Sequence, residues 1–454
     1  MKNELQKIAE YQNALLPLHE RKTEQAIKDA VDNAEKAYKD RSYNFKNYST
    51  LKLRQGSDRR IVKMYSPFSS EELLCIYLKR VLDKKYHISY PNRNTFIRSL
   101  FDTIYGLKDM SDYVIFKFDF SDFFNSVSSV YVYQKYIKEV GLERFQSELL
   151  REFVESTEYA YAGLNTSNIL CEIAAKSFDS LVMQKFKDAG LILYKRYVDD
   201  GIIIFNRYIS KDDCVACIQD AIKEAFYDCA SANAASCKVE LNSGKTAYIA
   251  RRNMVVGGNA SEFDFLGYVF VLNAKIGGKT EKTEFQYGIT DKKIAKYTKR
   301  INKIVREYNE APQKNMELLR HQIKAFTHRT VYRINRYKSV IWKSKGFLSN
   351  YCELRFHMDE LTPKTEKFLK EVVRDAFAIN GVALPYFMTN KDGESIYSLY
   401  NNMRKYRTLL LVEMIGIDCG ALKKMCSQVG IDVTTGKGYD GLVRDYLIKV
   451  KVGH

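Results

Sequence analysis

The segment YKRYVDDGIIIF, residues 194–205, places two adjacent acids between two apolar, β-branched runs. Apolar runs bounded by turn residues are typical of paired strands, and Asp followed by Gly is common in the turn that joins them. The segment therefore predicts a β-hairpin with Asp199 and Asp200 at its tip. These acids are either the polar residues of an ordinary turn or a pair of carboxylates that binds a divalent cation. The segment alone leaves both interpretations open.

A second predicted strand, DYVIFKFDF at residues 112–120, also ends in an acid. Successive side chains of a strand alternate, so Lys117 and Asp119 point away from the aromatic layer. A single Asp at a strand end is usually a turn or cap residue. If this strand lies beside the hairpin in one antiparallel sheet, however, Asp119 converges with Asp199 and Asp200. Three carboxylates at such range repel one another unless a multivalent cation neutralises them.

The charge balance favours a polyanionic partner, because 72 Lys and Arg against 55 Asp and Glu give a net charge of +17. The region between Lys292 and Lys345 contains sixteen basic residues and three acidic ones. A solvated helical face is the alternative to a nucleic-acid surface there. Interleaved aromatic side chains favour the nucleic-acid surface, on which bases stack. These aromatic residues are Tyr297, Tyr308, Phe326, Tyr332, Tyr337 and Trp342.

Cysteine, histidine and hydropathy patterns exclude several other classes of protein. Nine dispersed Cys predict reduced thiols, and the Cys214/Cys217 pair lacks a second pair at zinc-ligand spacing, so we expect it to pack within a helix. The six His are equally dispersed. The amino-terminal segment is charged and no run of about eighteen apolar residues occurs, so we expect a soluble, intracellular protein without membrane association.

The order of predicted elements favours an α+β fold in three regions. Residues 1–110 are mostly helical, with a short hairpin expected in LKLRQGSDRRIVKMYSP at residues 51–67. Residues 111–285 mix strands and helices, and FDFLGYVFVL at residues 263–272 is expected to be one strand. Residues 286–454 are predicted to be helical throughout.

Several of these segments resemble, in order, the palm of a reverse transcriptase. The matching segments are FDFSDFF (118–124, motif A), YVDD (197–200, motif C), LNSGKT (241–246, motif D), FDFLGY (263–268, motif E) and the fingers segment RQGSDRRIVKMYSP (54–67). The resemblance covers about residues 50–270. It implies right-hand polymerase fingers and palm, an antiparallel sheet with helices, followed by an all-α C-terminal domain in place of a thumb.

The resemblance also assigns roles to residues. Asp119, Asp199, Asp200 and the backbone carbonyl of Phe120 would bind two Mg²⁺ ions, with Mn²⁺ as the alternative, for in-line displacement at phosphorus. Phe124 falls on the position that excludes a 2′-hydroxyl, which implies deoxynucleotide substrates, whereas core packing is the alternative role for its ring. The other residues implied to contact the nucleotide are Lys52, Arg54, Arg59, Arg60, Gly163 and Lys245.

Two departures from the usual pattern favour one subgroup. In YAYAGLNTSNILCEIAA, residues 159–175, Ala162 stands where Gln is usual and Asn168 where Pro is usual. YPNRNTFIRSLFD at residues 90–102 and the basic tail resemble bacterial abortive-infection reverse transcriptases, which are anti-phage proteins. That resemblance implies a prophage-encoded, cytoplasmic homo-oligomer whose DNA synthesis is protein-primed and needs no template. None of the 33 Tyr is singled out as the primer.

Two other functions stay open at this stage. A retron-like enzyme would copy an RNA or DNA template, although the altered segment 159–175, which corresponds to motif B, and the helical C-terminal region 286–454 argue against it. A non-catalytic protein would bind nucleic acid on a polymerase scaffold, although three converging acids argue against that. For the first function, the expected partners are deoxynucleoside triphosphates and a single-stranded DNA product that self-priming would leave covalently attached.

Overall fold

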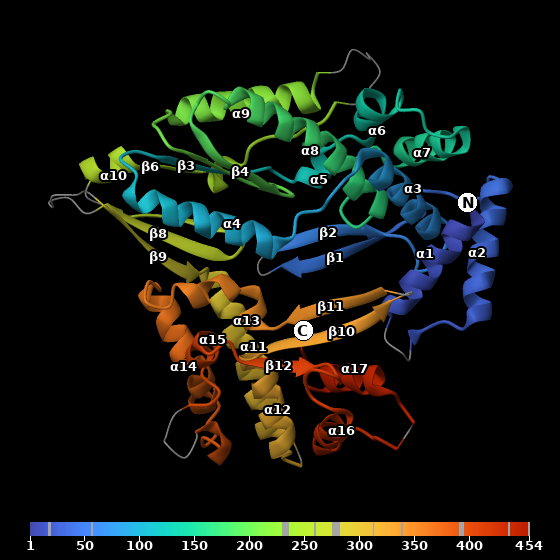
Figure 1. The fold of residues 1–454 in the computed structure, drawn as a ribbon. Coiled ribbons are helices and arrows are strands. Elements are labelled where there is room, and N and C mark those ends of the chain that lie inside the picture. The colour runs from blue at the N-terminus through green and yellow to red at the C-terminus, as the bar shows by residue number, and fades with distance from the viewer. Residues whose placement is uncertain are drawn as a thin grey trace. The chain divides into compact units, whose positions relative to one another are not determined.

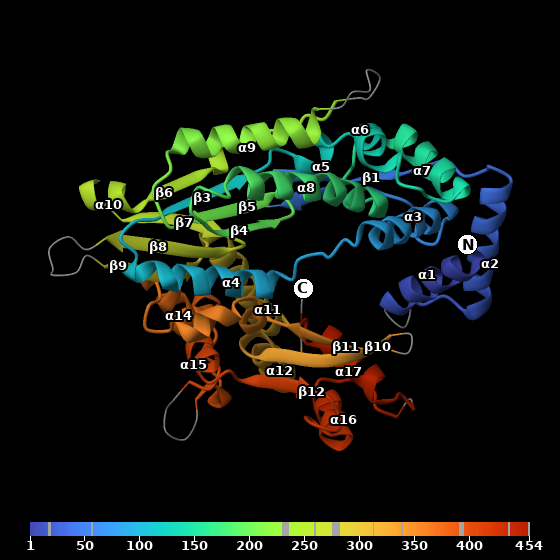
Figure 2. The same cartoon turned by 45° about the horizontal axis from the view of Figure 1, so that its top comes forward.

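Strand β3, Val114–Asp119, is an inner strand of an antiparallel sheet with the order β4-β5-β3-β6. Its aromatic side chains enter a core that also contains residues of helices α8 (Asn165–Lys185) and α9 (Lys211–Phe226). Phe118, for example, meets Phe178 of α8 edge to face at 6.0 Å. Both helices therefore cover one face of the sheet (Figures 1 and 2), and the face with Asp119 is the other one.

The computed structural model describes residues 1–16, 20–55, 58–228, 236–257, 260–274, 282–311, 313–336, 339–389, 395–434 and 436–452. The side chains of residues 54–60, 256, 257, 274, 334–336 and 339 also lie outside the description. The chain forms two units, unit 1 (Met1–Asn92 and Ser111–Asn253) and unit 2 (Arg93–Met110 and Met254–His454). The three functional regions expected from the sequence stay a prediction.

Besides the four-stranded sheet, unit 1 contains helices before β3 and between the strands of the sheet. A separate antiparallel hairpin, β1-β2, is found where the sequence predicts one. The elements of unit 1 are α1 (Lys2–Leu15), α2 (Glu24–Lys39), β1 (Ser49–Gln55), β2 (Asp58–Met64), α3 (Ser70–Tyr86), β3, α5 (Phe123–Ser126), α6 (Ser129–Val132), the π-helix η3 (Tyr133–Ile137), α7 (Arg144–Thr157), α8, β4 (Leu191–Tyr197), β5 (Asp200–Phe205), α9, the 3₁₀ helix η4 (Ser243–Lys245) and β6 (Ala247–Ala250). Helix α10 (Arg251–Gly257) contains the boundary at Asn253.

Unit 2 contains two three-stranded sheets, β7-β8-β9 and β11-β10-β12. Helix α4 packs on the first sheet through aromatic contacts, such as Phe96 stacked on Phe265 at 5.4 Å. The elements of unit 2 are α4 (Arg93–Gly106), η2 (Leu107–Asp109), β7 (Ser261–Phe265), β8 (Tyr268–Ala274), β9 (Thr283–Ile289), α11 (Asp291–Glu310), α12 (Met316–Thr327), β10 (Arg329–Arg336), β11 (Ser339–Lys345), α13 (Phe347–Asn350), η5 (Cys352–Phe356), α14 (Pro363–Ile379), η6 (Tyr386–Met388), α15 (Leu399–Arg404), β12 (Thr408–Leu411), α16 (Cys419–Gln428) and α17 (Tyr439–Lys449).

The fold is α+β with largely antiparallel sheets and a C-terminal region rich in helices, as the sequence predicts. The expectation of helix throughout residues 286–454 is wrong at β10, β11 and β12. Segments β10 and β11 are rich in β-branched and aromatic residues, which favour strands, and their many Arg and Lys obscured that pattern.

The single strand expected at residues 263–272 is also corrected, because the segment is a hairpin of β7 and β8. Its two central residues, Leu266 and Gly267, have φ of 46° and 87°. A two-residue turn with both φ positive matches the right-handed twist of the flanking strands. Leu is uncommon in such a turn, so only Gly267 carried a turn signal.

None of the helices in the described ranges combines the length and the apolar character that crossing a membrane requires.

Candidate metal centre

Three carboxylates meet at one end of the four-stranded sheet. Asp119, the last residue of β3, pairs directly with Asp200, the first residue of β5. The amide of Phe120 donates to the carbonyl oxygen of Asp199 over 3.2 Å, which ties the end of β3 to the hairpin turn. One oxygen of each carboxylate lies within 4.8 Å of the others. The convergence expected from the sequence is therefore present, and the pairing of β3 with β5 accounts for the meeting of Asp119 and Asp200.

The electrostatics of this cluster favour a bound cation. Burial, together with the charges of Asp199 and Asp119, raises the pKa of Asp200 to about 7, although the charge of Lys117 opposes the shift. Lys245 Nζ lies 2.8 Å from Oδ2 of Asp119, and this bond raises the pKa of Lys245. The ammonium groups of Lys117 and Lys245 are two positive charges beside three carboxylates, so they do not fully neutralise the cluster. Hard divalent cations such as Mg²⁺ prefer oxygen ligands of this kind, so the donor set fits the metal.

The hairpin turn that carries Asp199 has a strained backbone. The turn consists of Val198 and Asp199 between the paired residues Tyr197 and Asp200. Val198 has a φ of 61°, a left-handed conformation that a β-branched side chain rarely adopts. Glycine usually occupies the first central position of such turns. Strain of this kind costs of order 1–3 kcal/mol and persists only where surrounding contacts enforce it.

Arg196 supplies those contacts. Its Nη1 donates to the carbonyl oxygen of Val198 over 2.7 Å. The guanidinium also pairs with Glu172 at 2.9 Å and Asp179 at 2.8 Å, both on helix α8. Only 6 % of the Arg196 side chain is exposed, and although burial alone would lower its pKa, the two carboxylates raise it. The helix thereby fixes the turn that presents Asp199.

Sequence reasoning missed this support of the turn, although a signal was available. Glu172 and Asp179 are seven residues apart, so they lie on one face of α8, and Glu172 is buried among apolar residues of that helix. Acids at this spacing on a buried helix require a cation, and the strand that follows offers two basic residues, Lys195 and Arg196.

Gly163 allows strand β2 to lie close to the segment that precedes α8. Its φ is 104°, and a Cβ there would lie 2.4 Å from the carbonyl oxygen of Lys63. The amide of Lys63 donates to the carbonyl oxygen of Ala162 over 2.9 Å. Gly163 therefore permits a close backbone approach, and its contact with a nucleotide stays a prediction.

Lys63 is a further basic residue of the β1-β2 hairpin that the sequence did not single out. Its Nζ donates to the hydroxyl of Tyr48 over 3.0 Å and lies 2.9 Å from the ring centroid of Tyr161. The ammonium is therefore held between two aromatic side chains beside Gly163.

The remaining predicted nucleotide residues are placed as follows. Phe124 is half-buried on α5 and meets Phe123 edge to face at 6.1 Å, so part of its ring packs on the core of unit 1. Lys52 is exposed on β1, and within the described ranges no hydrogen bond or ion pair joins it to the carboxylates. The backbones of Arg54, Arg59 and Arg60 belong to β1 and β2, and their side chains lie outside the described residues.

Three of the six aromatic residues of the basic region are core residues, which corrects the expected base-stacking surface. Tyr297, Phe326 and Tyr332 are at most 8 % exposed. Tyr308 is half-buried, and Tyr337 lies outside the described residues. Trp342 is the exception, with 53 % of its surface exposed on β11.

Elsewhere the described residues hold no second group of three or more metal-ligating side chains. Cys214 is buried and Cys217 half-buried on helix α9, which confirms the expected helix packing of this pair.

No protein-family model matches the chain. No curated protein matches it either. A solved structure of telomerase from Candida albicans, in complex with a TWJ fragment of telomeric RNA, is 13% identical to the chain with a TM-score of 0.37. The match covers 88% of this chain and 60% of the telomerase chain, so this chain spans less than two thirds of that protein. The function proposed below therefore rests on the residues of this chain.

Proposed function

We propose that the chain is a DNA polymerase of reverse-transcriptase type, which adds deoxynucleotides by phosphoryl transfer at Asp119, Asp199 and Asp200. The observation that carries the proposal is the meeting of these three carboxylates within 4.8 Å, beside Lys245, at one end of an antiparallel sheet. A polar turn, the simpler explanation of Asp199 and Asp200, does not require the buried Asp119 beside them or the strained Val198 immediately before them.

Two Mg²⁺ ions held by these carboxylates and the Phe120 carbonyl would neutralise the attacking and leaving oxygens of an in-line displacement at phosphorus. The chain's own residues do the positioning. Strand pairing fixes Asp119 opposite Asp200, and Arg196 fixes the turn that carries Asp199. Lys245 keeps its proton because its bond to Asp119 raises its pKa, so it carries positive charge beside the site of transfer.

The proposed substrates are deoxynucleoside triphosphates, selected by the ring of Phe124. A half-buried ring held by Phe123 has little freedom to move aside for a 2′-hydroxyl. Phe124→Ala should therefore admit ribonucleotides, measured as the ratio of kcat/KM for matched deoxy- and ribonucleotides. Tyr136→Phe, which removes a hydroxyl bonded to the carbonyl of Ala225, is the control and should keep the ratio of the parent. An unchanged ratio in Phe124→Ala would leave the ring with a packing role alone.

We further propose that synthesis begins on a tyrosine of the chain and needs no template. Ala162 and Asn168, at the positions where Gln and Pro are usual, support this because that segment seats the templating base pair in the reverse transcriptases it resembles. The priming tyrosine is unassigned. Lys52, Arg54, Arg59, Arg60 and Gly163 complete the proposed nucleotide site.

The decisive experiment supplies the purified protein with labelled deoxynucleotides and Mg²⁺ alone and resolves the products on a denaturing gel before and after protease. Label that migrates with the protein and is released by protease supports self-priming. Product formed only with an added primer and template would identify a template-copying, retron-like enzyme. No incorporation under any of these conditions, with nucleic-acid binding retained, would identify a non-catalytic binding protein.

In the complete proposal, residues 1–110 hold the fingers, 111–285 the palm, and 286–454 a region that replaces the thumb and binds nucleic acid or further copies of the chain. The proposed setting is the bacterial cytoplasm, in a prophage-encoded, homo-oligomeric anti-phage protein. A phage-challenge assay that compares the parent with Asp199→Asn in a bacterial host tests this setting, and equal phage yields would contradict it.

A further inference from the structure

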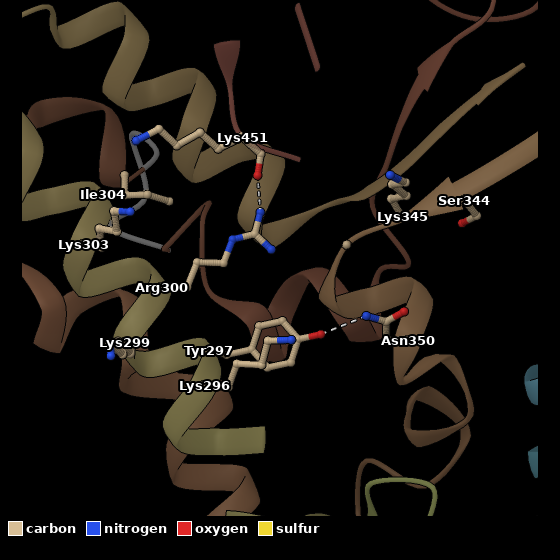
Figure 3. A pocket seen from close by; sticks show the side chains of 11 residues that line it. Lys296, Tyr297, Lys299, Arg300, Lys303, Ile304, Ser344, Lys345, Asn350 and Lys451 are labelled. Atoms are coloured by element: carbon tan, nitrogen blue, oxygen red, sulfur yellow. Dashed lines mark hydrogen bonds between the residues drawn. The ribbon is translucent and has the colours of Figure 1, made fainter. Parts of the chain in front are cut away.

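Unit 2 contains a cavity of about 490 Å³ whose charged lining residues are all basic (Figure 3). It lies between helix α11, the end of strand β11 and the residue Lys451 beyond α17. A volume of this size is typical of ligand sites. The six cations that line it are Lys296, Lys299, Arg300, Lys303, Lys345 and Lys451.

These cations are poorly compensated within the described parts of the chain. One carboxylate, that of Glu307, pairs with both Lys303 and Lys451. Among the described residues, no ion pair neutralises the other four, which are Lys296, Lys299, Arg300 and Lys345. Like charges three and four residues apart on a helix destabilise it, so α11 keeps this arrangement at a cost. An anionic ligand would offset that cost.

Arg300 is the most informative of these residues, because its guanidinium is partly buried and points into the cavity (Figure 3). Its Nη2 donates to the backbone carbonyl of Lys451, a neutral acceptor. Burial lowers the pKa of Arg300, and no carboxylate of the described residues opposes that shift. Five N–H donors on one guanidinium leave several for a ligand, and their fork geometry matches phosphate oxygens.

An aromatic platform lies on the same strand as the cavity wall. Val340, Trp342 and Ser344 share one face of β11 because side chains alternate, all three are exposed, and Ser344 lines the cavity. Two residues along a strand span roughly 7 Å, so the Trp342 indole lies about one nucleotide away from the cavity. Arg333 pairs with Trp342 across β10 and β11 and adds a cation there.

We propose that unit 2 binds single-stranded nucleic acid, with a backbone phosphate in the Arg300 cavity and a base stacked on Trp342. Cations that contact the backbone and aromatic rings that stack bases are the two parts of such sites. A duplex would hide its base faces from the indole. The identity of the strand as the DNA product rests on the proposed function, whereas the binding site does not require catalysis.

The test uses the full chain carrying Asp199→Asn, without divalent ions, so that synthesis cannot contribute. Trp342 is the only Trp of the chain, so its fluorescence reports the proposed stack directly. Titration with an oligodeoxythymidylate should quench that fluorescence to saturation, and the affinity should fall steeply with salt. An oligouridylate titrated in parallel distinguishes DNA from RNA as the preferred strand. Binding without any fluorescence change would contradict the stack.

Two triple variants test the cavity at equal charge change. Lys296→Gln/Lys299→Gln/Lys345→Gln should weaken binding at least about tenfold at 100 mM salt and lower the slope of log affinity against log salt by about 2, at about 0.7 for each phosphate that no longer meets a cation. The control, Lys367→Gln/Lys423→Gln/Lys424→Gln, removes three exposed lysines of unit 2 that do not line the cavity and should stay within about twofold of the parent. If the two variants lose affinity equally, the loss depends only on net charge and not on the cavity, and the proposal is overturned.

Binding of a labelled oligonucleotide tests Trp342 itself. Trp342→Ala should weaken binding by about 5- to 100-fold, whereas Trp342→Phe should keep most of the affinity because its ring still stacks. Equal affinity in the parent and Trp342→Ala would remove the stack. Pyrophosphate that binds the cavity tightly while the oligonucleotide does not bind would identify a site for small phosphorylated ligands and overturn the proposal.

Discussion

Unit 1 contains a cluster of carboxylates and unit 2 a cluster of cations, and the two clusters differ in how closely their charged groups lie together. The carboxylates of unit 1 stand on short side chains at paired strand ends, within 4.8 Å of one another and beside the ammonium of Lys245. The cations of unit 2 stand on long side chains spread over about two turns of α11 and two further segments. A rigid, narrow cluster suits a small hard cation, whereas a broad cluster on long side chains suits a polyanion.

The buried Arg196 of unit 1 and the partly buried Arg300 of unit 2 make the same contrast. Arg196 in unit 1 lies between Glu172 and Asp179, which raise its pKa. Arg300 in unit 2 bonds to a backbone carbonyl, pairs with no carboxylate of the described residues, and has a pKa that burial lowers. The first arginine is a structural part of the fold, and the second has unused charge. The same side chain is therefore compensated in unit 1 and left without a paired carboxylate of the described residues in unit 2.

The largest expected effect comes from removing one carboxylate of the acidic cluster of unit 1. Asp119→Asn or Asp199→Asn should reduce deoxynucleotide incorporation at least about a thousandfold, equivalent to roughly 4 kcal/mol in the barrier, because the divalent cations lose a charged ligand. Without divalent ions either variant should be at least as stable as the parent, since repulsion is relieved. Incorporation assays and thermal denaturation in a chelator measure the two effects. Asp212→Asn, an exposed acid of α9, is the control and should retain activity.

The second effect concerns the support of the Asp199 turn. Arg196→Gln should lower the free energy of unfolding by about 3–5 kcal/mol, because it leaves two carboxylates of α8 without their cation. Arg144→Gln removes an exposed helical pair with Glu148 and should cost about 0.3–0.5 kcal/mol. Urea denaturation of both variants gives the comparison. Similar decreases in the two would mean that Arg196 adds nothing beyond a surface ion pair.

A third effect concerns the positive environment of unit 2. Burial, with the charges of Lys324 and Arg407, lowers the pKa of His328 to about 4. Between the ordinary pKa of about 6.5 and 4 the unfolded chain binds a proton that the folded chain does not, so stability falls as pH falls, by roughly 3 kcal/mol in all. Urea denaturation followed by Trp342 fluorescence measures this in unit 2. His328→Gln should lose less stability over that range, and an identical pH profile would contradict the assignment.

The smallest effect tests whether the cavity costs stability. Lys296→Gln/Lys299→Gln should raise the free energy of unfolding by a few tenths of a kcal/mol at low salt, since these like charges are three residues apart on α11. The gain should disappear at about 1 M salt, where screening is strong. Lys423→Gln/Lys424→Gln is the matched control, because adjacent residues of a helix do not face each other. A gain that persists at high salt would have another cause than repulsion.

Predictions from the sequence succeeded where a local rule decides the structure. The alternation of β3 and the two-residue turn after Tyr197 place the acids at strand ends, and the pairing of β3 with β5 then brings Asp119 opposite Asp200. The hairpin at residues 263–272 was missed because a Leu with positive φ gives no turn signal. Tyr297 and Trp342 look alike in the sequence as aromatic residues among cations, yet one is buried and the other exposed.

The sequence by itself determined the places of the three acids at strand ends and in the turn, the excess of basic residues and the α+β class, because strand period and net charge are properties of neighbouring residues or of their sum. Only the tertiary structure decided that Glu172 and Asp179 hold Arg196, that Arg300 bonds to a backbone carbonyl, and that Trp342 is left exposed. Burial and pairing depend on segments far apart in the chain. A cation buried beside acids and a cation left beside a neutral carbonyl therefore carry the same letter in the sequence.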